Sequence, residues 1–174
     1  MTAILGGPAA ALGPRSIERV TGADRPATVP TVTIAYEWRG EFDNAELNAL
    51  HAEAFETRVY DESESDWTTL VHRHSLGWVV ARADGKLVGF VNVPWDGLVH
   101  AWIQDTMVSG ASRHQGIATR LVEMARHGAR DAGCEWLHVD FDEHLRSFYI
   151  DACGFTPVSA GLIALQEDEA APGV

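Results

Sequence analysis

The chain has 174 residues, of which 46 % are hydrophobic and 22 % charged, and its formal net charge is −12. This length suits one domain with a substantial core, and the composition is that of an ordinary folded protein. The excess of negative charge argues against nucleic acid and acidic membrane surfaces as partners and favours cationic partners, such as a protonated amine.

The sequence divides into an arm, a domain and a tail. Residues 1–30 contain repeated Gly and Pro without a sustained hydrophobic period, which predicts an irregular N-terminal arm. Residues 31–165 alternate between strand-like and helix-like patterns, so we expect one domain there. Residues 166–174 are predicted to be an acidic C-terminal tail.

The domain is expected to start with a strand over residues 31–37, where β-branched and aromatic residues alternate. A helix follows from Asp43, whose side chain can cap the helix N-terminus. The apolar stripe of this helix is Leu47, Leu50, His51, Ala54 and Phe55. A shorter helix is predicted over residues 63–73.

Three strands are predicted in the middle of the domain. The first two, over residues 76–82 and 87–93, flank Asp84-Gly85, which is a strong signal for a two-residue hairpin turn. The third strand covers residues 100–108.

A long helix over residues 116–132 follows and ends at Gly133. Its apolar stripe is Ile117, Leu121, Met124, Ala125 and Ala132. A strand over residues 136–140 and a helix over residues 143–152 come next. Two short strands, over 155–157 and 161–165, are predicted to close the domain. This order of elements indicates a mixed α/β (α+β) sheet with helices on its faces.

The stretch from residue 105 to residue 122 carries the strongest functional signal. A strand is expected to run into a loop and then into a helix that begins near Gly116. The first amides of a helix have no partner within the helix, and together with the helix dipole they can bind an anion. Gly116 leaves room for a pyrophosphate to approach the backbone, and Arg113 adds a planar cation. The turn lacks the G-x-G-x-x-G and Gly-Lys-Ser/Thr patterns, which argues against dinucleotide and Walker sites.

The pattern Arg113-x-x-Gly116-x-Ala118, with Val108 five residues before Arg113, resembles the acetyl-CoA motif of the GNAT acyltransferase superfamily. The resemblance covers residues 31–165. It implies a GNAT-like fold, in which a mixed sheet of about six to seven strands is flanked by about four helices. It also implies an N-acetyltransferase in which a primary amine attacks the thioester of acetyl-CoA directly.

A second match lies downstream. The segment from Asp142 through Tyr149 to Gly154-Phe155 resembles the family's last helix and closing strand. Tyr149 occupies the position of the family's general acid, which protonates the departing CoA thiolate. It precedes Gly154 by five residues, where the family usually has four, so a residue is inserted in this helix. Asp142 stands where Asn is usual.

The resemblance implies that the cofactor is held by the end of one strand, the turn and the later helix. The main chain of Met107 and Val108 would pair with pantetheine, and a backbone amide there would polarise the thioester carbonyl. Gln115 replaces a residue that is commonly basic, so Arg113 and the amides would bind more of the diphosphate charge. The implied cofactor-binding residues are Met107, Val108, Arg113, His114, Gln115, Gly116, Ile117, Ala118, Thr119 and Asp142.

The attacking amine must be neutral, so a base or a water chain has to remove its proton. Asp105 is our preferred base, and Tyr149 is the expected general acid. Other candidate bases are His100, His138, Glu41 and Asp43. Strand alternation places Gln104 and Asp105 on opposite faces of the strand without showing which residue points inward.

The remaining expectations concern metals, location and partners. Cys134 and Cys153 form no CxxC pair, and His72 and His74 lack a third ligand at a telling spacing, so we expect no bound metal. No apolar run is long enough to span a membrane, and the N-terminus lacks the basic segment of a signal peptide, which favours the cytoplasm. The acceptor is expected to be a small-molecule or peptide amine, and a homodimer is plausible.

Two alternatives to an acetyltransferase remain open. One is a non-catalytic acyl-CoA-binding module, regulatory or structural, that kept the turn around Gly116 but lost the chemistry. The other is a nucleotide-binding transferase that uses the same helix N-terminus.

Overall fold

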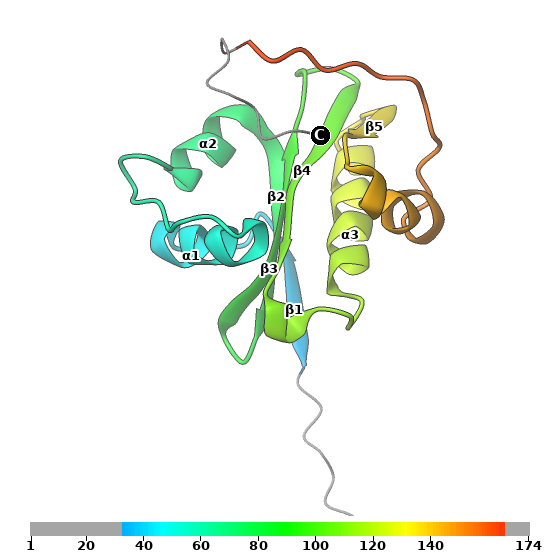
Figure 1. Ribbon diagram of the computed structural model, residues 1–174. Coiled ribbons are helices and arrows are strands. Elements are labelled where there is room, and N and C mark those ends of the chain that lie inside the picture. The colour runs from blue at the N-terminus through cyan, green and yellow to red at the C-terminus, as the bar shows by residue number, and fades with distance from the viewer. Residues whose placement is uncertain (1–32, 166–174) are drawn as a thin grey trace, which may run out of the picture. The chain divides into compact units, whose positions relative to one another are not determined.

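Five strands form one mixed sheet in residues 33–165, which are the residues that the computed structural model describes (Figure 1). The predicted arm and tail lie outside these residues. The strands follow one another across the sheet in sequence order, with β1 to β4 antiparallel and β5 parallel to β4. Their bounds are β1 Ile34–Trp38, β2 Ser75–Ala83, β3 Lys86–Pro94, β4 His100–Val108 and β5 Trp136–Val139.

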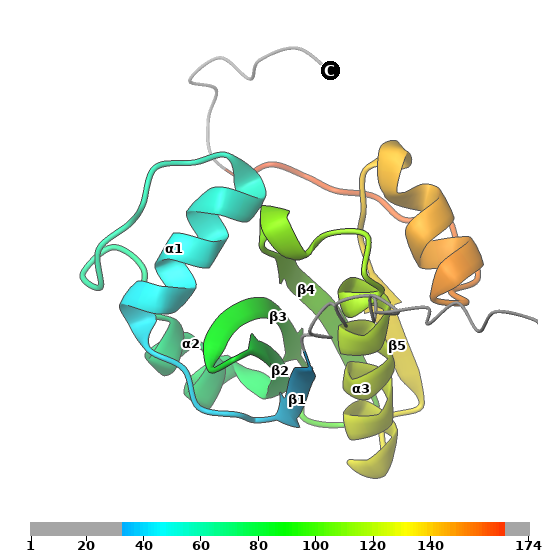
Figure 2. The ribbon, with the colours of Figure 1, turned by 90° about the horizontal axis from the view of Figure 1, so that it is seen from below.

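Helices cover both faces of the sheet, as Figures 1 and 2 show. One face carries α1 and α2, and the other carries α3 and a closing π-helix that follows a short 3₁₀ turn. The helical bounds are α1 Asn44–Phe55, α2 Trp67–His74, α3 Ile117–Asp131, the 3₁₀ turn Glu143–Leu145 and the π-helix Ser147–Ala152. Two apolar cores result, one on each face of the sheet. The predicted mixed sheet flanked by about four helices is therefore confirmed.

The first helix and the hairpin form where the local sequence predicts them. The Asp43 carboxylate accepts hydrogen bonds from the amides of Ala45 and Glu46, at 2.9 and 3.1 Å, and so caps α1. Between β2 and β3, Asp84 and Gly85 have φ angles of 48° and 82°. These left-handed conformations match the turn that suits the twist of two antiparallel strands.

The second helix is shorter than predicted, because α2 starts at Trp67 rather than at residue 63. The Asp66 carboxylate caps this helix by accepting a hydrogen bond from the Thr69 amide at 2.9 Å. The residues before it form a turn around the Asp61 carboxylate, which accepts from the Ser63 amide at 2.9 Å. These local side-chain bonds compete with helical pairing.

The sheet has five strands in the described residues, so the prediction of six to seven strands was wrong. Residues 155–157 and 161–165 have no regular secondary structure and pair with no described strand. The second of these segments is open to solvent: Leu162 is 96 % exposed and Leu165 is 94 % exposed. A strand needs a partner for its backbone groups, and short extended segments without one gain no sheet hydrogen bonds.

Candidate active site

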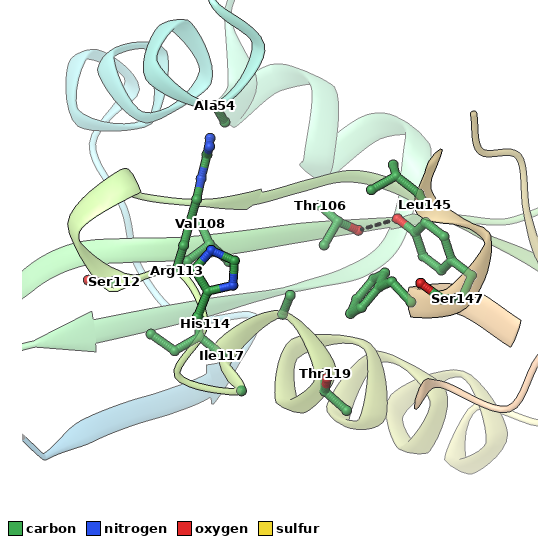
Figure 3. Close-up of a pocket in the computed structure, with 14 residues that line it drawn as sticks. Ala54, Thr106, Val108, Ser112, Arg113, His114, Ile117, Thr119, Leu145 and Ser147 are labelled. Atoms are coloured by element: carbon green, nitrogen blue, oxygen red, sulfur yellow. Dashed lines mark hydrogen bonds between the residues drawn. The ribbon is translucent and has the colours of Figure 1, made fainter. Parts of the chain in front are cut away.

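A cavity of about 560 Å³ lies between the end of β4, the start of α3 and the π-helix (Figure 3). Seven of the ten residues predicted to bind the cofactor line it: Val108, Arg113, His114, Gly116, Ile117, Ala118 and Thr119. Sequence reasoning missed other lining residues, among them Ala54, Thr106, Ser112, Leu145, Ser147 and Phe148. Thr106 could have been found, because in a strand it shares a face with Val108, two residues later.

The loop after β4 ends in two left-handed residues, and these turn the chain into α3. His114 has a φ of 62° and Gly116, the N-cap of α3, a φ of 77°. A Cβ added at Gly116 would meet no heavy atom within 4 Å, so the space above this residue is open. Glycine suits the position because it adopts this conformation without strain.

The amides at the start of α3 are available to a ligand. The first hydrogen bond of the helix runs from the Arg120 amide to the Gly116 carbonyl at 3.1 Å. No group among residues 33–165 accepts a hydrogen bond from the amides of Ile117, Ala118 or Thr119. These N–H groups point out of the helix end toward the cavity and make an anion-binding site.

The Arg113 and His114 side chains of the loop border the same space. Figure 3 shows the Arg113 side chain extending across the mouth of the cavity toward Ala54 of α1, with the His114 ring beside it. Arg113 forms no ion pair with a described residue. Gln115 does not line the cavity, and its side chain donates to the Ala111 carbonyl at 3.4 Å.

The segment before Gly154 is wound as a π-helix. The Cys153 amide donates to the Phe148 carbonyl, five residues earlier, at 3.0 Å. The segment is therefore neither the continuous helix predicted over 143–152 nor a regular α-helix. A π-turn holds one more residue than an α-turn, which is the winding that the extra residue implied by the family resemblance would need.

Tyr149 of this π-helix points into the cavity. Its hydroxyl donates a hydrogen bond to Thr106 Oγ1 at 3.3 Å, which Figure 3 marks with a dashed line. The ring is 6 % exposed and packs against Phe141, Phe148 and Phe155, with centroid distances of 5.2, 4.7 and 6.0 Å. Burial raises the pKa of Tyr149, and the bond to Thr106 opposes this rise. The phenol therefore stays protonated at neutral pH and can donate a proton.

A β-bulge in β4 decides where Asp105 points. Phe90 of β3 pairs with Met107, whereas Asn92, two residues on, pairs with Gln104, so β4 holds one extra residue. Asp105 takes this place with a φ of 52°. Beyond the bulge, Thr106 faces the cavity beside α3, while Met107 is fully buried in the core under α1 and α2.

Three influences determine the direction in which the pKa of the Asp105 carboxyl is shifted. Burial raises the pKa of this carboxyl. Asn92 of β3 and then His51 of α1 oppose the rise. The contact with Asn92 falls short of a full hydrogen bond, since the Asn92 Nδ2 has no partner. A carboxyl with a raised pKa suits a base, because its proton affinity lies closer to that of the group it serves.

Asp105 is not among the residues that line the cavity, and the other candidate bases also lie outside its lining. Asp43 is engaged as the cap of α1. His100 is the first residue of β4 and His138 lies in β5; the His100 Nδ1 and the His138 Nε2 are 2.7 Å apart, and the His138 ring stacks on those of both His100 and Trp102. Neither these histidines nor Glu41 is among the residues that line the cavity.

Residues 33–165 contain no group of three or more His, Cys, Asp or Glu side chains placed to hold a metal ion. His72, one of the two histidines considered as ligands, has its Nδ1 3.0 Å from the Thr68 carbonyl. None of the described helices combines the length and the apolar character that crossing a membrane requires.

Comparisons with known proteins agree with this geometry. The model of the Acetyltransferase (GNAT) family matches residues 36–155. No curated protein matches the chain in sequence. Solved structures share its fold at low sequence identity. A transcriptional regulator from Bacillus halodurans has 20 % identity and a TM-score of 0.64, over 76 % of this chain and 99 % of that one.

Two acetyltransferases of known structure also share the fold. An aminoglycoside N-acetyltransferase in complex with CoA has 15 % identity and a TM-score of 0.64, over 80 % of this chain and 99 % of that one. Glucosamine-6-phosphate N-acetyltransferase from Arabidopsis thaliana has 16 % identity and a TM-score of 0.60, over 76 % of this chain and 99 % of that one.

Proposed function

The chain belongs to the GNAT acetyltransferase family, and from this premise we propose that it transfers an acetyl group from acetyl-CoA to a primary amine. The observation that carries the proposal is the cavity on which free helix amides, a loop arginine and a buried tyrosine hydroxyl converge. The CoA bound to one structural relative is consistent with this co-substrate.

The start of α3 is the proposed diphosphate site. Its free amides from Ile117 to Thr119 can donate to phosphate oxygens, and Arg113 can add charge-assisted hydrogen bonds. In a chain with a net charge of −12, such a local concentration of donors and positive charge is needed to hold a polyphosphate.

The end of β4 is the proposed pantetheine site. Strand β5 pairs with β4 only from His100 to Ile103. From Gln104 to Val108 the edge of β4 that faces away from β3 has no strand partner among the described residues. The main chain of Met107 and Val108 can therefore hydrogen-bond to an extended amide-containing ligand. Its amide groups are also available to polarise the thioester carbonyl.

In the proposed reaction, the neutral amine attacks the thioester carbonyl, a C–N bond forms and the C–S bond breaks. Tyr149 gives its phenolic proton to the departing thiolate, and Asp105, directly or through water, takes the proton that the amine loses. Asp142 is exposed at the start of the 3₁₀ turn, outside the residues that line the cavity, and its contact with the cofactor stays a prediction.

We propose a small cationic amine as the acceptor and a cytoplasmic location for the protein. The structural relatives named for their reactions act on aminoglycosides and on glucosamine-6-phosphate, both of which carry amines on sugar rings. The acidic character of this chain favours an acceptor that arrives protonated.

The test is CoA release from acetyl-CoA with a panel of primary amines, measured for the wild type, Tyr149→Phe and the control Tyr36→Phe. Tyr36 lies in β1, outside the cavity lining. We expect turnover with at least one amine, a loss of roughly 100-fold or more in kcat for Tyr149→Phe, and little change for the control. Binding of acetyl-CoA without turnover on any amine would instead support the non-catalytic module.

A further inference from the structure

Two tryptophans on neighbouring strands, Trp102 of β4 and Trp136 of β5, stay outside both apolar cores of the described domain. Trp136 is 60 % exposed and Trp102 is half-buried. By contrast, Trp38, Trp67 and Trp78 pack into one core or the other. Large rings that gather on a surface without serving a core often mark a binding site.

The register of β4 and β5 places both rings on the face of the sheet that carries α1 and α2. His100 pairs with Trp136, and Trp102 pairs with His138. Residues paired in this way point to the same face, and the residues between them point to the other face. Ala101, between His100 and Trp102, is buried in the core under α3. The four residues His100, Trp102, Trp136 and His138 therefore share the opposite face, and we call them the ring patch.

The helices of that face leave the ring patch uncovered. Their core takes its β4 residue from the far end of the strand, at Met107. Within residues 33–165, no side chain of β5 belongs to this core. The patch is therefore a surface beside α1 and α2 that a ligand can reach.

Three rings of the patch form one stack. The centroid of the His138 ring lies 5.0 Å from that of His100 and 5.1 Å from that of Trp102, with interplanar angles of 27° and 22°. The His100 Nδ1 and the His138 Nε2 are 2.7 Å apart, which is hydrogen-bond distance. One of the two nitrogens must be the acceptor, so the two imidazoles do not both carry a charge. The stack is thus fixed in shape and carries at most one positive charge.

The chain around the patch is acidic. Residues 95–108 and 133–142 include β4, β5 and the residues on either side of them, and they contain five carboxylates and no lysine or arginine. The carboxylates are Asp96, Asp105, Glu135, Asp140 and Asp142. The faces of aromatic rings attract ammonium groups, and surrounding carboxylates strengthen this attraction. The patch is therefore complementary to an organic cation and unfavourable for an anion.

We propose that the ring patch binds a protonated amine of the acceptor, and that the acceptor carries a second amine, which is the one acetylated. This inference rests on the proposed function. The attacking amine must be neutral, whereas the patch selects a cation. One nitrogen cannot meet both requirements at the same time, so the acceptor needs two.

The position of the patch on β4 gives the spacing of the two amines. Pairing of β5 with β4 stops at Ile103, so the edge of β4 is open from there toward Thr106. Thr106 accepts a hydrogen bond from the Tyr149 hydroxyl, beside which the thioester is proposed to lie. From Trp102 to Thr106 a regular strand rises about 13 Å, and the bulge at Asp105 shortens this distance. The acceptor therefore carries its two amines roughly 10 Å apart.

The first measurement is the binding of octamethylenediamine, whose extended chain spans this distance, to the full chain without acetyl-CoA. NMR shows whether the ring signals of Trp102 and His138 shift, and calorimetry gives the Kd of each variant. We expect Trp102→Leu to raise the Kd roughly three- to thirtyfold, which is the range of a cation–π contact. Should Trp102→Leu fail to fold, Trp102→Phe keeps a weaker ring and should raise the Kd less.

The control variant is Trp95→Leu. Trp95 is 37 % exposed and forms a bridge with Ala101, so its ring points to the face opposite the patch. Its loss removes an exposed indole of the same kind from a nearby position, and the Kd for the diamine should stay at the wild-type value.

The second measurement is the rate of CoA release from acetyl-CoA with three amines. Octylamine has the same chain as octamethylenediamine but only one amine, and ethylenediamine has two amines that are too close together. We expect the lowest KM for octamethylenediamine, and Trp102→Leu should raise that KM to about the value for octylamine.

The outcomes separate this inference from the proposed function. An unchanged Kd in folded Trp102→Leu, or an equal KM for octamethylenediamine and octylamine, overturns the inference even if the enzyme acetylates both. Ring signals of Trp102 that follow the protein concentration rather than the diamine would assign the patch to a second copy of the chain and overturn it too. Binding at the patch without acetylation of any amine leaves the cation site intact and refutes the proposed function.

Discussion

Gly116 offers a direct test of the diphosphate site, because its structural and functional effects can be separated. Its φ of 77° is left-handed, and an added Cβ would meet nothing within 4 Å. Gly116→Ala should therefore lower the free energy of unfolding by roughly 1–2 kcal/mol, which is the cost of a left-handed conformation for a residue with a Cβ. Gly133, with a φ of 91° and the same open surroundings, lies past the other end of α3 and is the matched control.

Gly116→Glu adds a negative charge where the diphosphate is proposed to bind. Two phosphate charges about 6 Å from a carboxylate in water repel it by roughly 1–2 kcal/mol in total, which weakens binding about tenfold before any steric effect. Gly133→Glu places the same charge at the opposite helix end, so its affinity should stay at the wild-type value.

Calorimetric titration with CoA gives the affinity of each variant, and thermal unfolding with and without acetyl-CoA gives its stability. A wild type saturated at 100 times its Kd gains about 2.7 kcal/mol from the ligand, and Gly116→Glu, with a tenfold higher Kd, should gain only about 1.4 kcal/mol at the same ligand concentration. Equal affinity for CoA in Gly116→Glu and Gly133→Glu, with both variants folded, would refute the assignment of the α3 N-terminus as the diphosphate site.

Three further predictions concern the general acid and the stability of the domain. Thr106→Val removes the hydroxyl that can donate to the Tyr149 phenolate and thereby lowers the pKa of Tyr149, so the alkaline limb of kcat should move to higher pH, and Thr106→Ser should restore it; identical limbs would contradict this role. Burial raises the pKa of Glu46, but hydrogen bonds from an arginine and a backbone amide outweigh it and lower the pKa overall. Glu46→Gln should thus lower the free energy of unfolding in urea by about 1 kcal/mol at neutral pH. The difference from the wild type should vanish as the pH falls below 4.5, the usual pKa of a glutamate, whereas a difference that stays constant with pH would exclude this cause. Gly128→Ala should destabilise α3 by roughly 1–3 kcal/mol in thermal unfolding, because the Trp38 ring lies 2.6 Å from the new Cβ; a gain in stability would show that the ring moves aside easily.

The sequence predicted well those features that a few neighbouring residues decide. The cap of α1 depends on one carboxylate and on two backbone amides within three residues of it, so the identity of Asp43 was enough to predict the cap. The hairpin depends on two residues that tolerate positive φ, Asp84 and Gly85. The loop before α3 was found for the same reason, since Gly116 marks a left-handed N-cap and the amides after it need no side-chain identity to bind an anion.

Features that depend on distant partners could not be predicted in the same way. The apolar pattern of residues 161–165 suits a strand, yet only pairing decides whether a strand forms, and no described strand pairs with it. The spacing from Tyr149 to Gly154 predicted an extra residue in the last helix, but it could not predict that the backbone forms a π-helix there. The side chain of Tyr149 is aimed by packing against Phe141 and Phe155 from other segments.

The bulge in β4 resolves the question that strand alternation left open, and it links the two proposed proton-transfer groups. In a regular strand, neighbouring residues point to opposite faces and every second residue repeats. The extra residue at Asp105 breaks this alternation, so that Thr106 contacts Tyr149 in the cavity while Asp105 lies outside the cavity lining. The unpaired edge of β4 after Ile103 runs past Thr106, so a thioester placed along it would lie beside the Tyr149 hydroxyl, and the proposed transfer of a proton to Asp105 would pass through water.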